Sequence, residues 1–154
     1  MNKAIGLDLG TTTLGIAKSD VLGFVHGVET FRFAKGQYSK ARERVHQIVE
    51  ETDIKEIALG YPIHMNGEIG ERALSAIKFM EDLLKEDSTL NIVLVDERLT
   101  SVSANNTLSE LGVSHKQRKD SVDRLAACEI LDFYIKRREN NGNWWNSESW
   151  IRSK

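Results

Sequence analysis

Acidic side chains stand at three places where the sequence predicts that a strand ends or a helix begins. Asp8 ends one apolar run, and the adjacent Asp96 and Glu97 end another. Asp120 and Asp123 lie three residues apart, which places both on one face of a helix. Because the carboxyl ends of parallel strands meet at one edge of a sheet, we expect these groups to converge. Neighbouring strand residues point to opposite faces, so only one of Asp96 and Glu97 can face Asp8.

Converging carboxylates repel one another unless a cation lies between them. The carboxylates offer oxygen ligands, and the sequence has no Cys/His cluster. Both features favour Mg²⁺ or Mn²⁺ over zinc. We expect one or two such ions, and a pair about 3.5–4 Å apart would activate water and stabilise the leaving oxygen of a phosphodiester. The acidic positions therefore predict hydrolysis of phosphodiester bonds.

Ordinary structural roles remain open for the same residues. Asp8 could close a turn, and Asp120 could be the N-cap of the last helix with Asp123 in its first turn. A second capping box, Ser114 with Gln117, lies upstream and would leave both aspartates inside the helix. The sequence alone does not choose between these two helix starts.

Positive side chains that could hold a nucleic-acid backbone cluster beside these acidic positions. The densest basic run immediately precedes Asp120, Arg124 lies one turn beyond it, and Arg98 follows the second acidic pair. We expect five residues to contact phosphates: Arg98, Lys116, Arg118, Lys119 and Arg124. A solvated loop, or an ion pair between Arg98 and Asp96, is the plain alternative. The loop at 60–70 should overlook the same strand ends.

The elements that must position these residues follow from the hydrophobic pattern. Three strands in succession predict an antiparallel meander, and two later strands, each preceded by a helix, predict parallel crossovers. The expected strands are 3–9, 14–18, 24–31, 54–59 and 91–95, and the expected helices are 38–52, 68–86, one between Thr100 and Gly112, and 119–138. The sequence thus predicts an α/β fold with a mixed five-stranded sheet and helices on both faces.

Length and composition limit the domain organisation and the class of protein. The chain has 154 residues, a net charge of −2 and one cysteine, so it can form one domain with its own core and no internal disulfide. We expect a domain at 1–139 and a tail at 140–154 that holds all three tryptophans. Apolar runs are too short for a signal peptide or a membrane span, so we expect a cytoplasmic protein without a membrane partner.

Four segments of the chain resemble one known family. They are GLDLGTTTLGIAKSD at 6–20, GYPIHMNGEIGERA at 60–73, VLVDERLTSVSANNTL at 93–108 and KQRKDSVDRLAACEILDFYI at 116–135. Together they resemble the YqgF (RuvX) family, known as Holliday-junction-resolvase-like proteins and as nucleases of the 5′ end of pre-16S rRNA. The segments DERLT and VDRLAA are the most specific parts of the match, which covers residues 3 to about 138.

The resemblance implies an RNase H-like fold and a metal-dependent nuclease. It implies Asp8, Glu97 and Asp123 as the catalytic, metal-binding carboxylates, and Asp120 as a candidate for a fourth ligand. Asp96 would then point away from the metal or support the site from outside.

One position departs from the family's pattern. The family usually has an arginine where this chain has Thr13. A phosphate contact would be lost there unless Lys18 or Arg98 supplies it.

Several functions are compatible with these residues. Processing of the 5′ end of pre-16S rRNA needs only a monomer that acts on structured RNA, although a dimer is possible, and this is the function we expect. A Holliday junction resolvase, the alternative, needs a two-fold dimer that cuts branched DNA. A further alternative is a non-catalytic adaptor that binds RNA or a ribosome-associated protein. The run at 8–13 also resembles the phosphate loop of actin-like and sugar-kinase ATPases, but those enzymes need two such domains.

Overall fold

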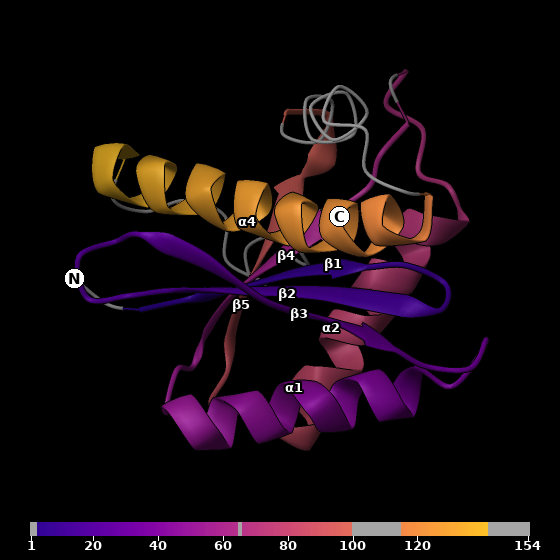
Figure 1. Cartoon of the computed structure of the whole chain (residues 1–154), viewed down its shortest axis with the longest axis horizontal. Helices are drawn as coiled ribbons and strands as arrows, with labels where there is room; N and C mark the ends of the chain where they lie inside the picture. Colours follow the sequence, from indigo (N-terminus) through magenta and orange to yellow (C-terminus); the bar gives the residue numbers. More distant parts are fainter. Residues whose placement is uncertain (1–2, 65, 100–114, 142–154) are drawn as a thin grey trace.

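A five-stranded mixed sheet forms the centre of the computed structural model, which describes residues 3–64, 66–99 and 115–141 (Figure 1). The strands are β1 (Ile5–Leu9), β2 (Thr13–Ser19), β3 (Val25–Arg32), β4 (Glu56–Tyr61) and β5 (Asn91–Asp96). Their order in the sheet is β3-β2-β1-β4-β5. β1, β2 and β3 pair antiparallel, whereas β4 is parallel to both β1 and β5. The predicted meander with parallel crossovers is confirmed.

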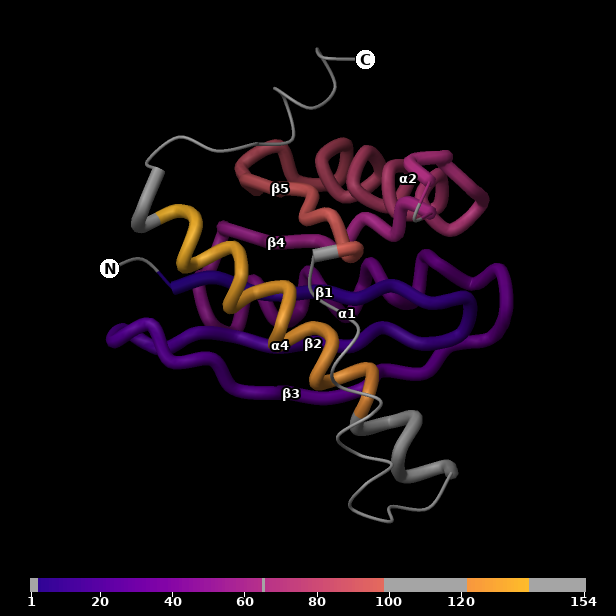
Figure 2. Tube along the Cα trace, turned by 90° about the horizontal axis from the view of Figure 1, so that it is seen from above, coloured from indigo at the N-terminus to yellow at the C-terminus, as the bar shows by residue number. Residues whose placement is uncertain are grey.

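Helices cover both faces of this sheet, as predicted. Helices α1 (Tyr38–Thr52) and α2 (Glu71–Glu86) pack on one face, and a short 3-10 helix, η1 (Glu97–Leu99), follows β5. Helix α4 (His115–Asn141) crosses the other face diagonally (Figure 2). None of the described helices is long and apolar enough to cross a membrane. The predicted helix between 100 and 112 and the tail from 142 onward lie outside the described residues.

The two faces of the sheet carry different cores. The α1 and α2 side holds the larger one, built from branched and aromatic side chains such as Ile5, Leu59 and Phe79. The α4 side is richer in small residues, because the helix backbone lies directly on the strands. A Cβ atom at Gly15 would stand 2.1 Å from the carbonyl oxygen of Asp123, so only glycine allows this approach.

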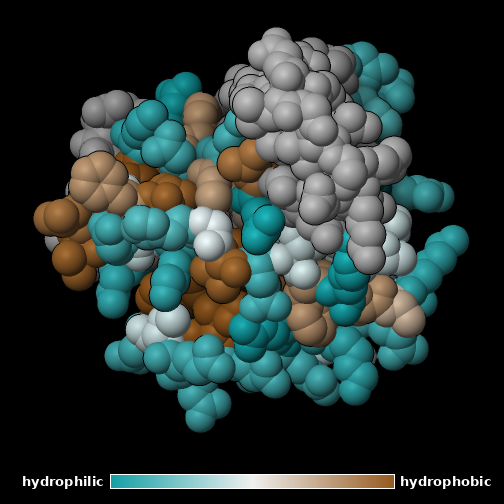
Figure 3. Space-filling view, in the orientation of Figure 1, coloured by the Kyte–Doolittle hydropathy of each residue, from teal (hydrophilic) through white to brown (hydrophobic). Residues whose placement is uncertain are grey.

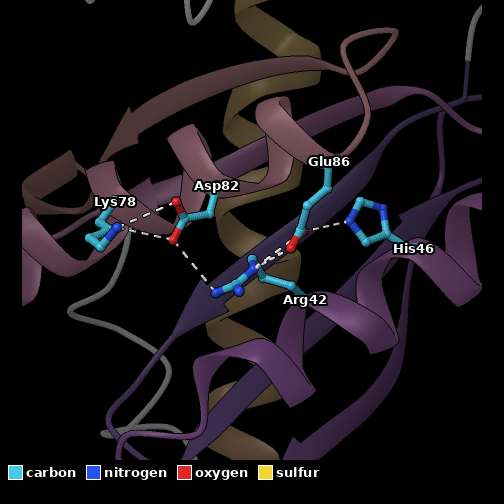
Figure 4. A network of polar contacts seen from close by, with 5 residues as sticks. All are labelled: Arg42, His46, Lys78, Asp82 and Glu86. Atoms are coloured by element: carbon cyan, nitrogen blue, oxygen red, sulfur yellow. Dashed lines mark hydrogen bonds and ion pairs between the residues drawn. The ribbon is translucent and has the colours of Figure 1, made fainter.

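Polar contacts join α1 to α2 outside the larger core (Figure 4). Arg42 of α1 lies 3.0 Å from Glu86 and 3.6 Å from Asp82, both on α2. His46 adds a contact of 2.9 Å to Glu86, and Lys78 lies 3.3 Å from Asp82. Arg42 and His46 thus join α1 to α2, whereas the pair Lys78–Asp82 lies within α2.

Some element boundaries differ from those that the sequence predicts. β4 begins and ends two residues later than expected and runs to Tyr61, because the next residue, Pro62, has no N–H for the ladder. Helix α2 begins at Glu71, three residues late, because the preceding loop folds back on itself through a hydrogen bond from the His64 amide to the Glu68 carbonyl. Leu74, near the start of this helix, is 56% exposed.

Apolar side chains also gather on the surface. Val21, Leu22 and Phe24, in and beside the turn between β2 and β3, are all more than 60% exposed. Figure 3 shows apolar side chains at the end of the molecule where Figure 1 shows this turn. Phe24 was expected in the third strand, but that strand begins one residue later. This turn lies at the end of the sheet opposite the carboxyl ends of β1, β4 and β5.

Candidate active site

The parallel strands bring the first acidic residue to the expected edge of the sheet. Asp8 lies near the carboxyl end of β1, directly opposite Gly15 of β2. Gly15 is the residue on which the α4 backbone rests at Asp123. The strand pairing and the glycine contact therefore bring Asp8 and Asp123 together, although 115 positions separate them in the sequence.

Glu97 reaches the same place from the end of β5. The chain leaves the extended conformation at this residue and enters η1, so Glu97 itself is no longer part of the strand. The Glu97 side chain is buried, with 9% exposed, and lies against β4. A Cβ atom at Gly60 would stand 3.0 Å from the Glu97 carboxyl carbon, so glycine leaves the space that this carboxyl occupies.

The electrostatics of these carboxyl groups reflect their burial. Burial raises the pKa of Asp8, and the neighbouring Asp123 charge raises it further. Burial and the Asp8 charge raise the pKa of Glu97 to about 8. The carboxyl groups of Asp8 and Glu97 are hydrogen-bonded to each other, while Oδ1 of Asp8 is buried and accepts no hydrogen bond from the described residues. Without a cation, the folded protein favours a proton on this pair.

Arg72 is the positive side chain whose charge acts on both Asp8 and Glu97. The sequence alone did not single it out. It lies in the first turn of α2 and donates a hydrogen bond of 3.1 Å to the backbone carbonyl of Leu9, the last residue of β1. Its charge lowers the pKa values of both Asp8 and Glu97, against the larger effect of burial. The only sequence signal was its place inside the segment 60–73, beside a strand end.

Asp96 and Arg98 form an ion pair beside the site. The guanidinium Nε and Nη2 atoms of Arg98 donate to the two Asp96 oxygens, and the shortest of these contacts is 2.6 Å. The Arg98 backbone amide also donates to Asp96, at 2.9 Å. Asp96 thus pairs with its own neighbour, and Arg98, expected to bind nucleic acid, is engaged by that carboxylate.

Helix α4 places the last acidic pair inside a helix rather than at its start. It begins at His115, so the alternative in which Asp120 is the N-cap is wrong and the upstream start is correct. The side chains of Lys116, Arg118, Lys119 and Asp120 lie outside the described part of the chain, and their roles stay predictions. Arg124 is exposed, and its Cβ lies over Gly27 of the edge strand β3.

The two side chains considered as substitutes for the missing family arginine are not free at the site. Lys18 pairs with Ile5 at the start of β1, which is the opposite end of the strand from the acidic residues. This proposal for Lys18 is therefore wrong. Arg98 is near the site but bound to Asp96. Thr13 itself is buried in the turn after β1, where its carbonyl accepts a hydrogen bond of 2.7 Å from Gly10.

The chemistry of the donor set fits a hard divalent cation. Among the described residues, no three acidic, histidine or cysteine side chains lie close enough together to form a ready metal site. Asp8 and Glu97 nevertheless contact each other at a buried point, and Oδ1 of Asp8 has a free lone pair there. Two adjacent carboxylates with oxygen donors suit Mg²⁺ or Mn²⁺. These two residues would hold the ion, with Asp123 next to Asp8.

Solved structures identify the fold of this chain. The chain resembles RuvC from T. thermophilus in complex with a Holliday junction substrate, with a TM-score of 0.58 and 14% sequence identity. The match covers 90% of this chain and 96% of the other. A second structure of Thermus thermophilus RuvC matches with a TM-score of 0.52 and 12% identity. The chain therefore has the RNase H-like α/β fold, as the resemblance of its motifs implied.

Sequence comparisons identify the family. The family model described as "RuvX: Holliday junction resolvase" matches residues 2–137. A relative from Shouchella clausii, named "Putative pre-16S rRNA nuclease", is 37% identical over 139 residues, which is 90% of this chain and 97% of the relative. A relative of the same name from Listeria monocytogenes serotype 4b is 40% identical over 134 residues, covering 86% and 96%. The chain belongs to the RuvX family, and the names of these relatives describe hydrolases that cleave phosphodiester bonds.

Proposed function

We propose that this protein is a metal-dependent nuclease that processes the 5′ end of pre-16S rRNA in the cytoplasm. The observation that carries the proposal is the buried contact between Asp8 and Glu97 at the carboxyl edge of the sheet. Burying two carboxyl groups against each other costs stability, unless a proton or a cation offsets the repulsion. The names of the curated relatives support the choice of RNA as substrate.

In this proposal the acidic residues bind the metal and the basic residues bind the substrate. Asp8 and Glu97 would hold Mg²⁺ or Mn²⁺, and Asp123, with Asp120 as a further candidate, would complete the set of ligands. A metal bound there supplies an activated water and stabilises negative charge on the phosphate. The basic residues near the start of α4, Lys116, Arg118, Lys119 and Arg124, would hold the backbone of the strand.

Cleavage of two labelled substrates tests the proposal. One is a structured RNA with a 5′ extension and the other is a four-way DNA junction, each incubated with Mn²⁺, with Mg²⁺ or with chelator. We expect metal-dependent cleavage of the RNA that the substitution Asp8→Asn abolishes. The matched control is Asp53→Asn, the same chemical change at an exposed helix end whose left-handed backbone (φ 57°) asparagine adopts readily.

The outcomes separate the candidate functions. Paired, symmetric nicks in the junction, with intact RNA, would replace the proposal by a resolvase, which the family model's description favours. Cleavage by Asp8→Asn at the wild-type rate would refute the assignment of the acidic residues. A wild-type protein that binds RNA but cuts neither substrate with any metal would favour an adaptor.

A further inference from the structure

A pocket lies beside the acidic residues, between the end of β4 and the start of α2. Its volume is about 560 Å³, within the range of pockets that bind small molecules. The residues that line it are Pro62, Ile63, His64, Gly70, Glu71 and Arg72. The pocket belongs to the same edge of the sheet as Asp8, because Arg72 also contacts the backbone at the end of β1.

Arg72 forms no ion pair within 4.0 Å of a carboxylate oxygen in the described part of the chain, although its charge acts on Asp8 and Glu97 from farther away. Each of four other arginines has a carboxylate oxygen within 4.0 Å: Arg42, Arg44, Arg98 and Arg138. Arg72 makes one hydrogen bond among the described residues, from Nη2 to the Leu9 carbonyl. A guanidinium has five N–H donors, so four remain for a ligand.

Neighbouring residues keep this guanidinium in place and leave room beside it. The bond to Leu9 fixes one side of the planar group to the sheet. The wall opposite is a loop closed by hydrogen bonds from the Gly67 amide to the His64 carbonyl, 2.8 Å, and from the His64 amide to the Glu68 carbonyl, 3.0 Å. A Cβ atom at Gly70 would stand 2.4 Å from Nε2 of His64, so glycine lets the imidazole lie against the pocket wall.

The ligand that this arrangement suits is a singly or doubly charged oxyanion. A planar guanidinium binds phosphate with two parallel N–H bonds, which an ammonium group cannot reproduce. Glu71 lines the same pocket and would repel an anion that sits deep beside it, which favours a phosphate bound at the Arg72 side. A nucleic-acid strand on the acidic edge carries such groups at every nucleotide.

We propose that Arg72 binds a backbone phosphate of the nucleic-acid strand in this pocket, next to the phosphate that is cleaved. The proposal rests on the proposed nuclease function, since it assumes that the strand lies across Asp8 and Glu97. Arg72 would supply the phosphate contact that the family's arginine makes at position 13. Thr13 cannot make that contact here, and Arg98 is bound to Asp96. His64 is the second side chain that reaches the same ligand.

Binding of a fluorescent 2′-O-methyl RNA strand, measured in chelator at several salt concentrations, tests the proposal without any cleavage. The variants are Arg72→Gln and Arg72→Lys, and the control is Lys78→Gln, which removes the same charge from α2 where it faces Asp82. We expect Arg72→Gln to weaken binding about tenfold. It should reduce the slope of log Kd against log salt by about 0.7, as loss of one phosphate contact to a single strand does. Arg72→Lys should keep the slope and bind with intermediate affinity.

A second probe identifies the phosphate itself. A series of strands carries one uncharged methylphosphonate each, at a different position along the strand. We expect the substitution at one position to weaken wild-type binding most. The same substitution should have no such effect on binding by Arg72→Gln. Should the glutamine variant fail to fold, Arg72→Lys takes its place and should show a smaller effect at that position. An unchanged pattern in the variant, or an affinity and slope equal to those of Lys78→Gln, overturns the proposal.

These results are separable from those that test the nuclease. A wild-type protein that binds the strand but cleaves nothing with Mn²⁺ or Mg²⁺ refutes the proposed function and leaves the Arg72 contact standing. A wild-type protein that cleaves RNA while Arg72→Gln binds normally refutes the Arg72 contact alone. A wild-type protein that binds no strand overturns both.

Discussion

Replacing Glu97 by glutamine should stabilise the metal-free protein, and the gain should grow with pH. Burial together with the Asp8 charge raises the pKa of Glu97 from 4.5 to about 8 in the folded protein. The unfolded chain therefore releases this proton near pH 4.5, whereas the folded protein holds it until about pH 8. Ionisation of Glu97 favours the unfolded chain across this interval. Glutamine has no proton to lose, and it can donate a hydrogen bond to Asp8.

The size of the gain follows from the two pKa values. Each pH unit between them corresponds to about 1.4 kcal/mol, so the penalty above pH 8 is at most about 5 kcal/mol. Part of the rise in the Glu97 pKa comes from Asp8, with which Glu97 shares its proton. That part belongs to the pair rather than to Glu97 alone, so the substitution recovers less than the upper limit. We expect Glu97→Gln to gain roughly 3 kcal/mol at pH 8.5 and less than about 1 kcal/mol at pH 5.

Urea unfolding followed by circular dichroism, in chelator at pH 5 and pH 8.5, measures this gain. The control is Glu43→Gln, at a side chain that is 64% exposed, and it should change stability by less than about 0.5 kcal/mol at either pH. Adding Mn²⁺ should reverse the order, because the wild type alone keeps both carboxylates for the ion. A gain that is equal at the two pH values, or no gain at pH 8.5, would refute the account of the Asp8–Glu97 pair.

Three further predictions concern the contacts that hold the helices in place. Gly15→Ala would place a Cβ atom 2.1 Å from the Asp123 carbonyl, so it should cost about 3 kcal/mol or more in urea unfolding. Gly27→Ala, where the nearest atom is 3.6 Å away, should cost less than about 1 kcal/mol, and equal losses would contradict the close approach. Glu56→Ala removes the acceptor shared by Tyr134 and Arg138 and should cost about 2 kcal/mol; a loss below that of Lys40→Ala would show that the contact contributes little. Arg42→Ala should lower stability by about 1 kcal/mol at low salt, and 1 M salt should reduce the difference, unless packing of the arginine stem rather than charge provides it.

The sequence predicts most of the fold because its strands and helices carry clear hydrophobic periods. Helix 38–52 is predicted to the residue, since its buried positions, among them Ala41, Val45 and Ile48, recur at helical spacing. The order of strands follows from a meander and two crossovers. The β4 boundaries were misplaced because Ile54 is buried without being part of the strand, so an apolar residue alone does not mark where pairing begins.

The site was predictable in part. Asp8 follows from its place at a strand end, and the resemblance to the family, not the strand pattern, singles out Glu97 over Asp96. The strand pattern leaves this choice open, and nothing in the local composition marks the turn into η1 at Glu97. Arg72 was missed for a related reason: its position depends on where α2 begins, and the sequence places that start three residues too early.

Two of the contacts between helix α4 and the sheet lie far apart along the helix, and their spacing has a consequence for the length of the chain. Asp123 rests on Gly15 at one point, and Tyr134 reaches Glu56 at the other. The two residues are eleven positions apart, which is about three helical turns, so both face the sheet. One residue inserted between them would rotate one contact by about 100° relative to the other. An insertion in this stretch would therefore displace either Asp123 from the site or Tyr134 from Glu56. The width of the sheet thus determines how many residues this part of the helix must have.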